Sequence, residues 1–188
     1  MNLTPETWPR PHRLTVDEYY RMAEVGLLPP DARVELIEGE IIDMAPIGSR
    51  HAATVNGLAK TLILAVGDSA VVAVQSPLRL SHRSEPQPDL AVLRPRADRY
   101  RDSHATAPDV LLLVEVSDTT LRFDRNVKAK LYARHGIPEL WIVDVNSEQL
   151  HVLGKPLRGE YAEAATVRFG VMGIPGGVGE VDLTRLSA

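Results

Sequence analysis

The chain contains no cysteine among its 188 residues. This absence excludes disulfides, thiolate zinc sites and cysteine nucleophiles, so any metal must be held by oxygen or histidine ligands. Aromatic residues make up only 5% of the chain, which leaves few platforms for stacking on sugars. The apolar runs, such as residues 62–66, are far shorter than the roughly 20 residues that span a bilayer, so we expect no contact with a membrane.

The amino-terminal residues lack the basic and then apolar profile of a secretory signal, so we expect the chain to stay in the cytoplasm. The net charge of -4 gives no overall attraction to nucleic acid, and such a partner needs local basic patches. The content of 44% hydrophobic and 24% charged residues is ordinary for a globular protein. We expect a single domain over residues 1–188, with a core at 13–155 and C-terminal strands and a tail at 156–188.

Hydrophobic spacing and capping residues predict alternating helices and strands. Helices are predicted at residues 15–26, where Thr15 and Glu18 form a capping box, at 49–67 with Ser49 as N-cap, and at 118–136. Strands are predicted at residues 33–37 and 40–44, joined by a tight turn, and at 71–75, 78–81, 89–93, 110–117, 140–143, 149–153 and 164–169. An arginine-rich connector is expected at 94–107 and a flexible glycine-rich turn at 170–179. This order predicts an α/β (α+β) fold, a mixed sheet flanked by helices.

Glu115 interrupts the otherwise apolar strand of residues 110–117. A buried carboxylate without a partner costs several kcal/mol, so such groups are usually paired, protonated or bound to a metal. A second carboxylate, Asp89, opens another apolar strand. Adjacent strands could bring the two together, and two carboxylates with a backbone carbonyl suffice to hold magnesium. The alternative is that Asp89 caps a strand and Glu115 pairs with an arginine.

Lys128 lies on the helix that follows this strand, where its ammonium could point back at the same site. A lysine there can orient water or stabilise charge on a phosphate. Asp124, four residues earlier, could orient Lys128 or form only a pair along the helix. The alternative is a solvated helix face, which explains Lys130 and Arg134 better than Lys128.

Further polar residues are weaker candidates. His51 begins the second predicted helix and Gln75 lies in an apolar strand, and both could support metal ligands or be ordinary satisfied polar groups. Four arginines of the connector and Tyr100 could contact phosphates and stack on a base. A solvated loop, in which nearby aspartates balance the arginines, explains them equally well.

These segments together resemble the Uma family of restriction-endonuclease-like proteins, within the PD-(D/E)XK nuclease superfamily. The resemblance covers most of the chain and depends on the order and spacing of its motifs. They are Arg33-Val34-Glu35-Leu36-Ile37-Glu38-Gly39-Glu40, Pro88-Asp89-Leu90, Val114-Glu115-Val116-Ser117 followed by Asp124, Lys128 and Tyr132, and the segment from Gly136 to Asp144.

The resemblance implies a restriction-endonuclease-like fold and a phosphodiesterase that uses Mg²⁺ or Mn²⁺. Asp89, Glu115 and the Val116 carbonyl are the implied metal ligands. Where the superfamily has a lysine two positions after the glutamate, this chain has Ser117, and the resemblance suggests that Lys128 supplies the amine, with Lys130 as the second candidate.

Glu35 resembles the family's early acidic position and is expected to complete the acidic cluster. The alternative interpretation is that Glu35 is a solvent-facing residue of a hairpin strand.

We therefore predict an endonuclease that hydrolyses DNA phosphodiester bonds with metal-activated water. The resemblance and the need to cut both strands favour a homodimer or a higher homo-oligomer. Two alternatives stay open. The same fold could bind nucleic acid without turnover, which the displaced lysine permits, or Asp89 and Glu115 could be the acid and nucleophile of a sugar hydrolase. The low aromatic content makes the last alternative the least favoured.

Overall fold

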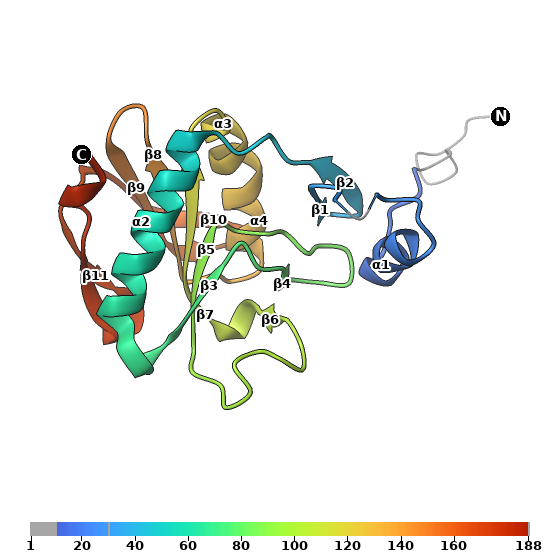
Figure 1. Cartoon of the computed structure of the whole chain (residues 1–188), viewed down its shortest axis with the longest axis horizontal. Coiled ribbons are helices and arrows are strands. Elements are labelled where there is room, and N and C mark those ends of the chain that lie inside the picture. Colours follow the sequence, from blue (N-terminus) through green and yellow to red (C-terminus); the bar gives the residue numbers. More distant parts are fainter. Residues whose placement is uncertain (1–10, 30, 188) are drawn as a thin grey trace. The chain divides into compact units, whose positions relative to one another are not determined.

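The structure, a computed structural model, describes residues 11–29 and 31–187 (Figure 1). Residues 1–10, 30 and 188 of the predicted domain lie outside the described residues. The chain divides into two compact units, one made of Met1–Ala45 with Leu80–Pro86 and the other of Pro46–Arg79 with Gln87–Ala188. The single domain stays a prediction.

The first unit contains the helix α1 (Val16–Glu24) and the hairpin of β1 (Val34–Ile37) and β2 (Glu40–Asp43). The predicted capping box is present, because the Glu18 amide donates to Thr15 Oγ1 and the Thr15 amide donates to Glu18 Oε2 at 2.7 Å. The predicted hairpin is also confirmed. Its turn residues Glu38 and Gly39 both have positive φ, of 50° and 79°, as a two-residue turn matched to the twist of the strands requires.

The second unit is built on a six-stranded sheet in the order β10-β9-β8-β7-β5-β3. Neighbouring strands are antiparallel except β7 and β8, which are parallel and therefore need a crossover connection. The predicted mixed sheet is confirmed. Its strands are β3 (Val71–Val74), β5 (Leu90–Leu93), β7 (Val110–Ser117), β8 (Glu139–Asp144), β9 (Gln149–Leu157) and β10 (Glu160–Arg168).

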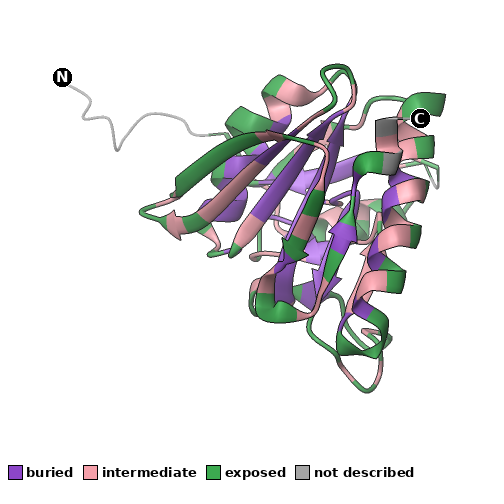
Figure 2. Cartoon of the chain, turned by 90° about the vertical axis from the view of Figure 1, so that its left-hand side faces the viewer, coloured by how far each residue is buried: buried purple, intermediate pink, exposed green. Residues whose placement is uncertain are grey.

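Helix α2 (Ser49–Val66) packs on one face of this sheet (Figure 1). Leu58 and Leu62 of the helix are fully buried against alternate residues of the central strands, such as Leu90 and Val114. The spacing of three and four residues along α2 creates this apolar stripe. The central strands β5 and β7 are buried along their whole length, and Figure 2 shows such residues in purple. The main core therefore lies between α2 and the sheet.

The crossover from β7 to β8 lies on the opposite face of the sheet. It consists of α3 (Leu121–Phe123), a π-helical segment η4 (Asp124–Lys128) and α4 (Ala129–Arg134). The prediction of one regular helix over residues 118–136 was wrong in this respect. The Ala129 amide donates to the Asp124 carbonyl, five residues back, and such a wider turn is seldom visible in hydrophobic spacing.

Other boundaries also differ from the predictions. Ser49 is the first residue of α2 and not its cap, since Gly48 occupies the N-cap position without a side-chain hydrogen bond. The strand predicted at 78–81 is reduced to β4 (Leu78–Arg79), which pairs in parallel with β6 (Ala105–Thr106) inside the predicted connector.

The predicted flexible turn at 170–179 is wrong, because it contains most of a hairpin of β11 (Val171–Ile174) and β12 (Gly179–Asp182). Buried Ile174 and Val181 fix this hairpin in the core beside α2. Gly179 allows a close approach, because a Cβ atom there would lie 2.4 Å from the Ala65 carbonyl oxygen of α2. Every helix of the described residues is too short or too polar to traverse a lipid bilayer.

Candidate active site

A polar row crosses three strands of the second unit. Val74, Leu90 and Val114 are paired across β3, β5 and β7. Gln75 and Asp89 lie one residue outside β3 and β5, and the same register, continued by one residue, aligns them with Glu115 of β7. The backbone bond from the Gln75 amide to the Asp89 carbonyl, at 3.0 Å, continues the ladder to this position. Residues opposite each other in a sheet share a face, so the two predicted carboxylates lie on one face of adjacent strands.

Asp89 is held by three hydrogen bonds. Gln75 Nε2 donates to Oδ1 at 3.2 Å, while Oδ2 lies 3.1 Å from His51 Nε2 and accepts from the Val116 amide at 2.9 Å. Burial pushes the pKa of Asp89 upward, but the hydrogen bonds and charge of His51, with the Val116 and Gln75 bonds, outweigh it and hold the pKa below its ordinary value. Asp89 is thus an ionised, oriented carboxylate at neutral pH. His51 and Gln75 contact this carboxylate, and their role as supporting residues of a metal ligand stays a prediction.

The Val116 carbonyl lies on the Asp89 side of β7. An extended residue directs its N–H and C=O to the same neighbouring strand, and the Val116 N–H is bonded to Asp89. The β5 ladder ends at Leu90, opposite Val114, so β5 offers no backbone partner at this position. The Val116 carbonyl is therefore compatible with its predicted role as a metal ligand.

Glu115 is bonded to two residues of the crossover. Lys128 Nζ lies 3.2 Å from Glu115 Oε1, and the Tyr132 hydroxyl donates to the same oxygen at 2.6 Å. All three residues are buried, with Glu115 only 3% and Lys128 only 5% exposed. Lys130, the second candidate, is instead exposed and lies 3.8 Å from Glu160 Oε1. Of the two lysines, Lys128 is therefore the one beside Glu115.

Asp124 links the end of β7 to the segment that carries Lys128. Its Oδ2 accepts from Ser117 Oγ at 2.7 Å and from Thr120 Oγ1 at 2.6 Å. Ser117, at the position where the superfamily has its lysine, is fully buried and used for this contact. Asp124 thus helps to fix the start of η4, from which Lys128 reaches Glu115.

Glu35 lies in β1, in the first unit, and is only 2% exposed. The interpretation of Glu35 as a solvent-facing strand residue is therefore wrong. The same unit contains a second buried carboxylate, Glu85, whose Oε1 accepts from the Tyr20 hydroxyl at 2.7 Å. Burial raises the pKa of Tyr19, and the negative charges of Glu85 and Glu35 add to this effect.

Two polar residues received no role from the sequence. Tyr132 is a fully buried aromatic whose hydroxyl fixes Glu115, and its position four residues after Lys128 was the available signal. Glu85 carries no such signal, because it lies in a polar stretch that resembles an exposed turn.

The donor atoms of the row fit a hard divalent cation. Within residues 11–29 and 31–187, no three acidic, histidine or cysteine side chains converge as metal ligands. The two carboxylates with the Val116 carbonyl stay the predicted ligand set. Magnesium keeps several waters and needs only one or two carboxylates, and an ionised carboxylate offers about four lone-pair positions, more than the hydrogen bonds to Asp89 use. All-oxygen ligands suit magnesium or manganese better than zinc.

Comparisons with known proteins agree with this fold. A family model described as "Uma2: Putative restriction endonuclease" matches residues 16–182. The structure is similar to the crystal structure of a "putative nuclease" from Anabaena variabilis ATCC 29413, with a TM-score of 0.68 and 16% identity, over 93% of this chain and 97% of that chain. No protein of curated function matches the chain. At this identity the structural likeness shows the fold, and the expected nuclease fold is confirmed.

Proposed function

Because the chain belongs to the Uma2 family of restriction-endonuclease-like proteins, we propose that it is a divalent-metal-dependent endonuclease that hydrolyses DNA phosphodiester bonds. The observation that carries this proposal is the set of buried contacts at the end of β7, where the Val116 amide donates to Asp89 and Lys128 is paired with the neighbouring Glu115. Burying charged carboxylates and a lysine costs desolvation free energy, and such groups are concentrated at functional sites.

Asp89, Glu115 and the Val116 carbonyl would hold Mg²⁺ or Mn²⁺. When bound, such a cation lowers the pKa of a coordinated water and stabilises negative charge on a phosphate oxygen. His51 and Gln75 fix the Asp89 carboxylate, so that its oxygens are directed before the substrate arrives.

Lys128 would act on the phosphate or on the attacking water. An ammonium has three donors, so a bond to Glu115 is compatible with a second bond to a substrate oxygen. Tyr132 holds the same carboxylate oxygen and restricts the position at which Lys128 approaches. In this scheme the lysine offsets charge that develops in the transition state. Glu35 is proposed to assist as a further acidic residue.

Cleavage of supercoiled plasmid by purified protein tests the proposal. Wild type is incubated with Mg²⁺, Mn²⁺ or chelator beside Asp89→Asn, Glu115→Gln and Lys128→Ala. Lys130→Ala and Glu160→Gln are matched controls, because both residues are exposed. We expect metal-dependent nicking, lowered at least about 100-fold by the first three changes and little changed in the controls. Full activity of Glu115→Gln would overturn the proposal.

The same purified protein distinguishes the nuclease from the two alternative functions. Tight binding of DNA without metal-stimulated nicking would favour a catalytically inactive nucleic-acid-binding module of the same fold. Cleavage that is independent of added metal would favour the two-carboxylate hydrolase. The homodimer stays a prediction, which sedimentation of the purified chain tests.

A further inference from the structure

A pocket of about 440 Å³ opens beside the edge strand β3 in the second unit. Its floor is apolar and comes from β3, from Ala91 and Leu93 of β5, and from Leu78. Arg99, Tyr100 and His104 of the arginine-rich connector form another part of its wall. The volume lies in the range of about 300–1,000 Å³ that is typical of sites for small molecules.

The pocket adjoins the polar row of the candidate active site. Ala91 is paired with Leu113 of β7, so Ala91 shares a face of the sheet with Leu113 and Glu115. Two residues of a strand separate these positions, roughly 7 Å at about 3.4 Å per residue. Val74, the last residue of β3, and Ser76, just after the strand, line the pocket and flank Gln75, which donates to Asp89. A nucleic-acid strand bound at Asp89 and Glu115 would thus pass close to this pocket.

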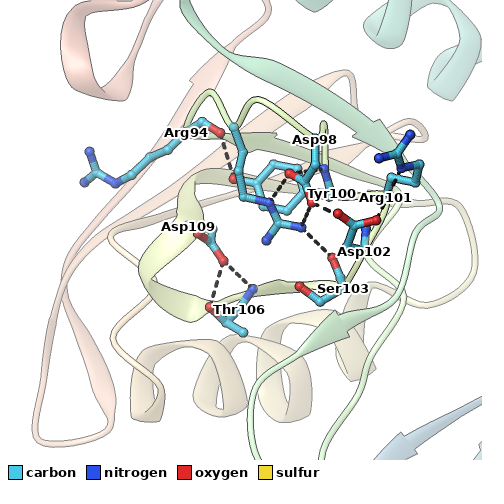
Figure 3. Close-up of polar contacts among 9 residues, drawn as sticks. Arg94, Asp98, Tyr100, Arg101, Asp102, Ser103, Thr106 and Asp109 are labelled. Carbon is cyan, nitrogen blue, oxygen red and sulfur yellow. Dashed lines mark hydrogen bonds and ion pairs between the residues drawn. The ribbon is translucent and has the colours of Figure 1, made fainter.

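The connector wall is built around an ion pair between Arg96 and Asp98. Arg96 Nε and Nη2 donate to the two carboxylate oxygens at 2.5 and 2.9 Å, and Nη2 also donates to the Ser103 carbonyl. The Arg96 bond, with the backbone amides of Tyr100 and Asp102, lowers the pKa of Asp98 to about 2. Figure 3 shows Asp98 within this network. The loop is therefore ordered by its own contacts.

This network fixes the ring of Tyr100. Its hydroxyl donates to the Arg94 carbonyl at 2.7 Å (Figure 3). The Arg96 guanidinium carbon lies 4.0 Å from the ring centroid. Arg99 and Tyr100 have consecutive positive φ values of 50° and 63°, which residues with side chains rarely adopt. Such conformations persist only where the surroundings impose them, and they are concentrated at binding sites.

Among the described residues, Arg99 is the one connector arginine that lines the pocket. Arg96 is neutralised by Asp98, and Arg101 lies 3.3 Å from Asp102. Arg99 lines the pocket, and its guanidinium has no carboxylate partner within the described part of the chain. An apolar floor, a fixed aromatic ring and one such arginine complement a ligand with a flat apolar part and an adjoining anion.

We propose that this pocket binds one nucleotide of the nucleic-acid strand, with its base on the apolar floor and its phosphate against Arg99. That the ligand is part of a nucleic-acid strand and not a free nucleotide rests on the proposed function, since the pocket adjoins Asp89 and Glu115. Bases stack on aromatic side chains whatever their sequence, and arginine suits phosphate. The pocket would hold the strand near the scissile bond.

The test is an NMR titration in chelator, so that neither metal nor cleavage is needed. The probes are thymidine 5′-monophosphate, thymidine, deoxyribose 5′-phosphate and a thymidine hexanucleotide. Arg99→Gln is compared with Arg101→Gln, a matched change in the same loop at a side chain that is 82% exposed and outside the pocket lining. Ala73→Leu fills the floor, and its own spectrum reports whether the fold is retained.

We expect thymidine 5′-monophosphate to shift the amide signals of residues 71–74 and 99–105. The hexanucleotide should shift the same signals with at least tenfold higher affinity. Arg99→Gln should weaken hexanucleotide binding about five- to tenfold and lower its salt slope by about one unit, while Arg101→Gln changes affinity less than twofold. Ala73→Leu should weaken the nucleotide more than deoxyribose 5′-phosphate.

Other outcomes would overturn the proposal. Equal binding of deoxyribose 5′-phosphate and the nucleotide would exclude a base in the pocket. Equal affinity for nucleotide and hexanucleotide would assign the site to a free nucleotide. Self-association through β3, blocked by Ala73→Leu without nucleotide shifts, would assign the edge to a second copy. Because every arm contains chelator, failure of plasmid cleavage leaves these results interpretable on their own.

Discussion

Replacing Lys128 with methionine is expected to lower the free energy of unfolding by about 3 kcal/mol at pH 7. The change keeps a long side chain and removes the ammonium 3.2 Å from Glu115 Oε1. The side chains of Lys128 and Glu115 are 6% and 4% exposed, so the carboxylate loses its partner in a buried position. Removing one member of a buried ion pair typically costs about 3–5 kcal/mol.

The low end of that range applies because Tyr132 continues to donate to the same oxygen. For a chain of this length about 3 kcal/mol corresponds to a melting temperature lower by roughly 6–12 °C. Urea unfolding followed by circular dichroism measures the free energy, with Lys130→Met as the exposed control, expected within about 0.5 kcal/mol of wild type.

The double variant Lys128→Met with Glu115→Gln separates charge from packing. Because the second change removes the uncompensated charge, the double variant should be more stable than Lys128→Met alone, by at least about 1 kcal/mol. Two results would refute the buried pair of Lys128 and Glu115. One is that Lys128→Met unfolds at the same urea concentration as wild type. The other is that the double variant loses as much free energy of unfolding as the two single variants added together.

Three further predictions concern other contacts. Tyr132→Phe should destabilise the protein by about 1.5–3 kcal/mol in urea unfolding, because Glu115 loses a hydrogen bond to a charged acceptor; a change below about 0.5 kcal/mol would show that this bond is not formed. Asp98 should titrate near pH 2 in carboxyl NMR, and its pKa should return toward 3.8 in Arg96→Gln. Because the pKa is lowered in the folded protein, the stabilisation of the loop by ionised Asp98 is complete above about pH 4 and is lost as the pH falls through 2. A wild-type pKa near 3.8 would contradict this prediction. Gly179→Ala should lower stability by at least about 2 kcal/mol, because its Cβ meets the Ala65 carbonyl, whereas Gly173→Ala, with open space around it, should be nearly neutral; equal effects would show that β12 does not approach α2 so closely.

Local patterns predicted the elements whose causes are local. The capping box at Thr15, the turn at Glu38-Gly39 and the apolar stripe of α2 are specified by residues within one or two turns of each other. Strands β5, β7 and β8 were predicted from apolar runs that are buried on both faces. Glu115 interrupts such a run in β7, and its role in a metal site stays a prediction.

Features that depend on contacts between distant residues were not predicted from the sequence. The π-helical turn of η4 produces no periodic signal, and β11 and β12 lie in a glycine-rich stretch that becomes ordered only by pairing and by packing on α2. The hydrogen bond from Tyr132 to Glu115 joins two elements and could not be inferred from either alone. The roles of Asp89, Glu115, Lys128 and Glu35 in catalysis stay predictions.

Binding of Mn²⁺ followed by electron paramagnetic resonance tests the metal site most directly. Wild type is titrated beside Asp89→Asn and Glu115→Gln, with the exposed Glu160→Gln as the control. One bound Mn²⁺ per chain, weakened at least about tenfold by either change in the row and unchanged in the control, is the predicted result. Binding that both variants retain at wild-type strength would contradict the assignment of Asp89 and Glu115 as the metal ligands of a nuclease.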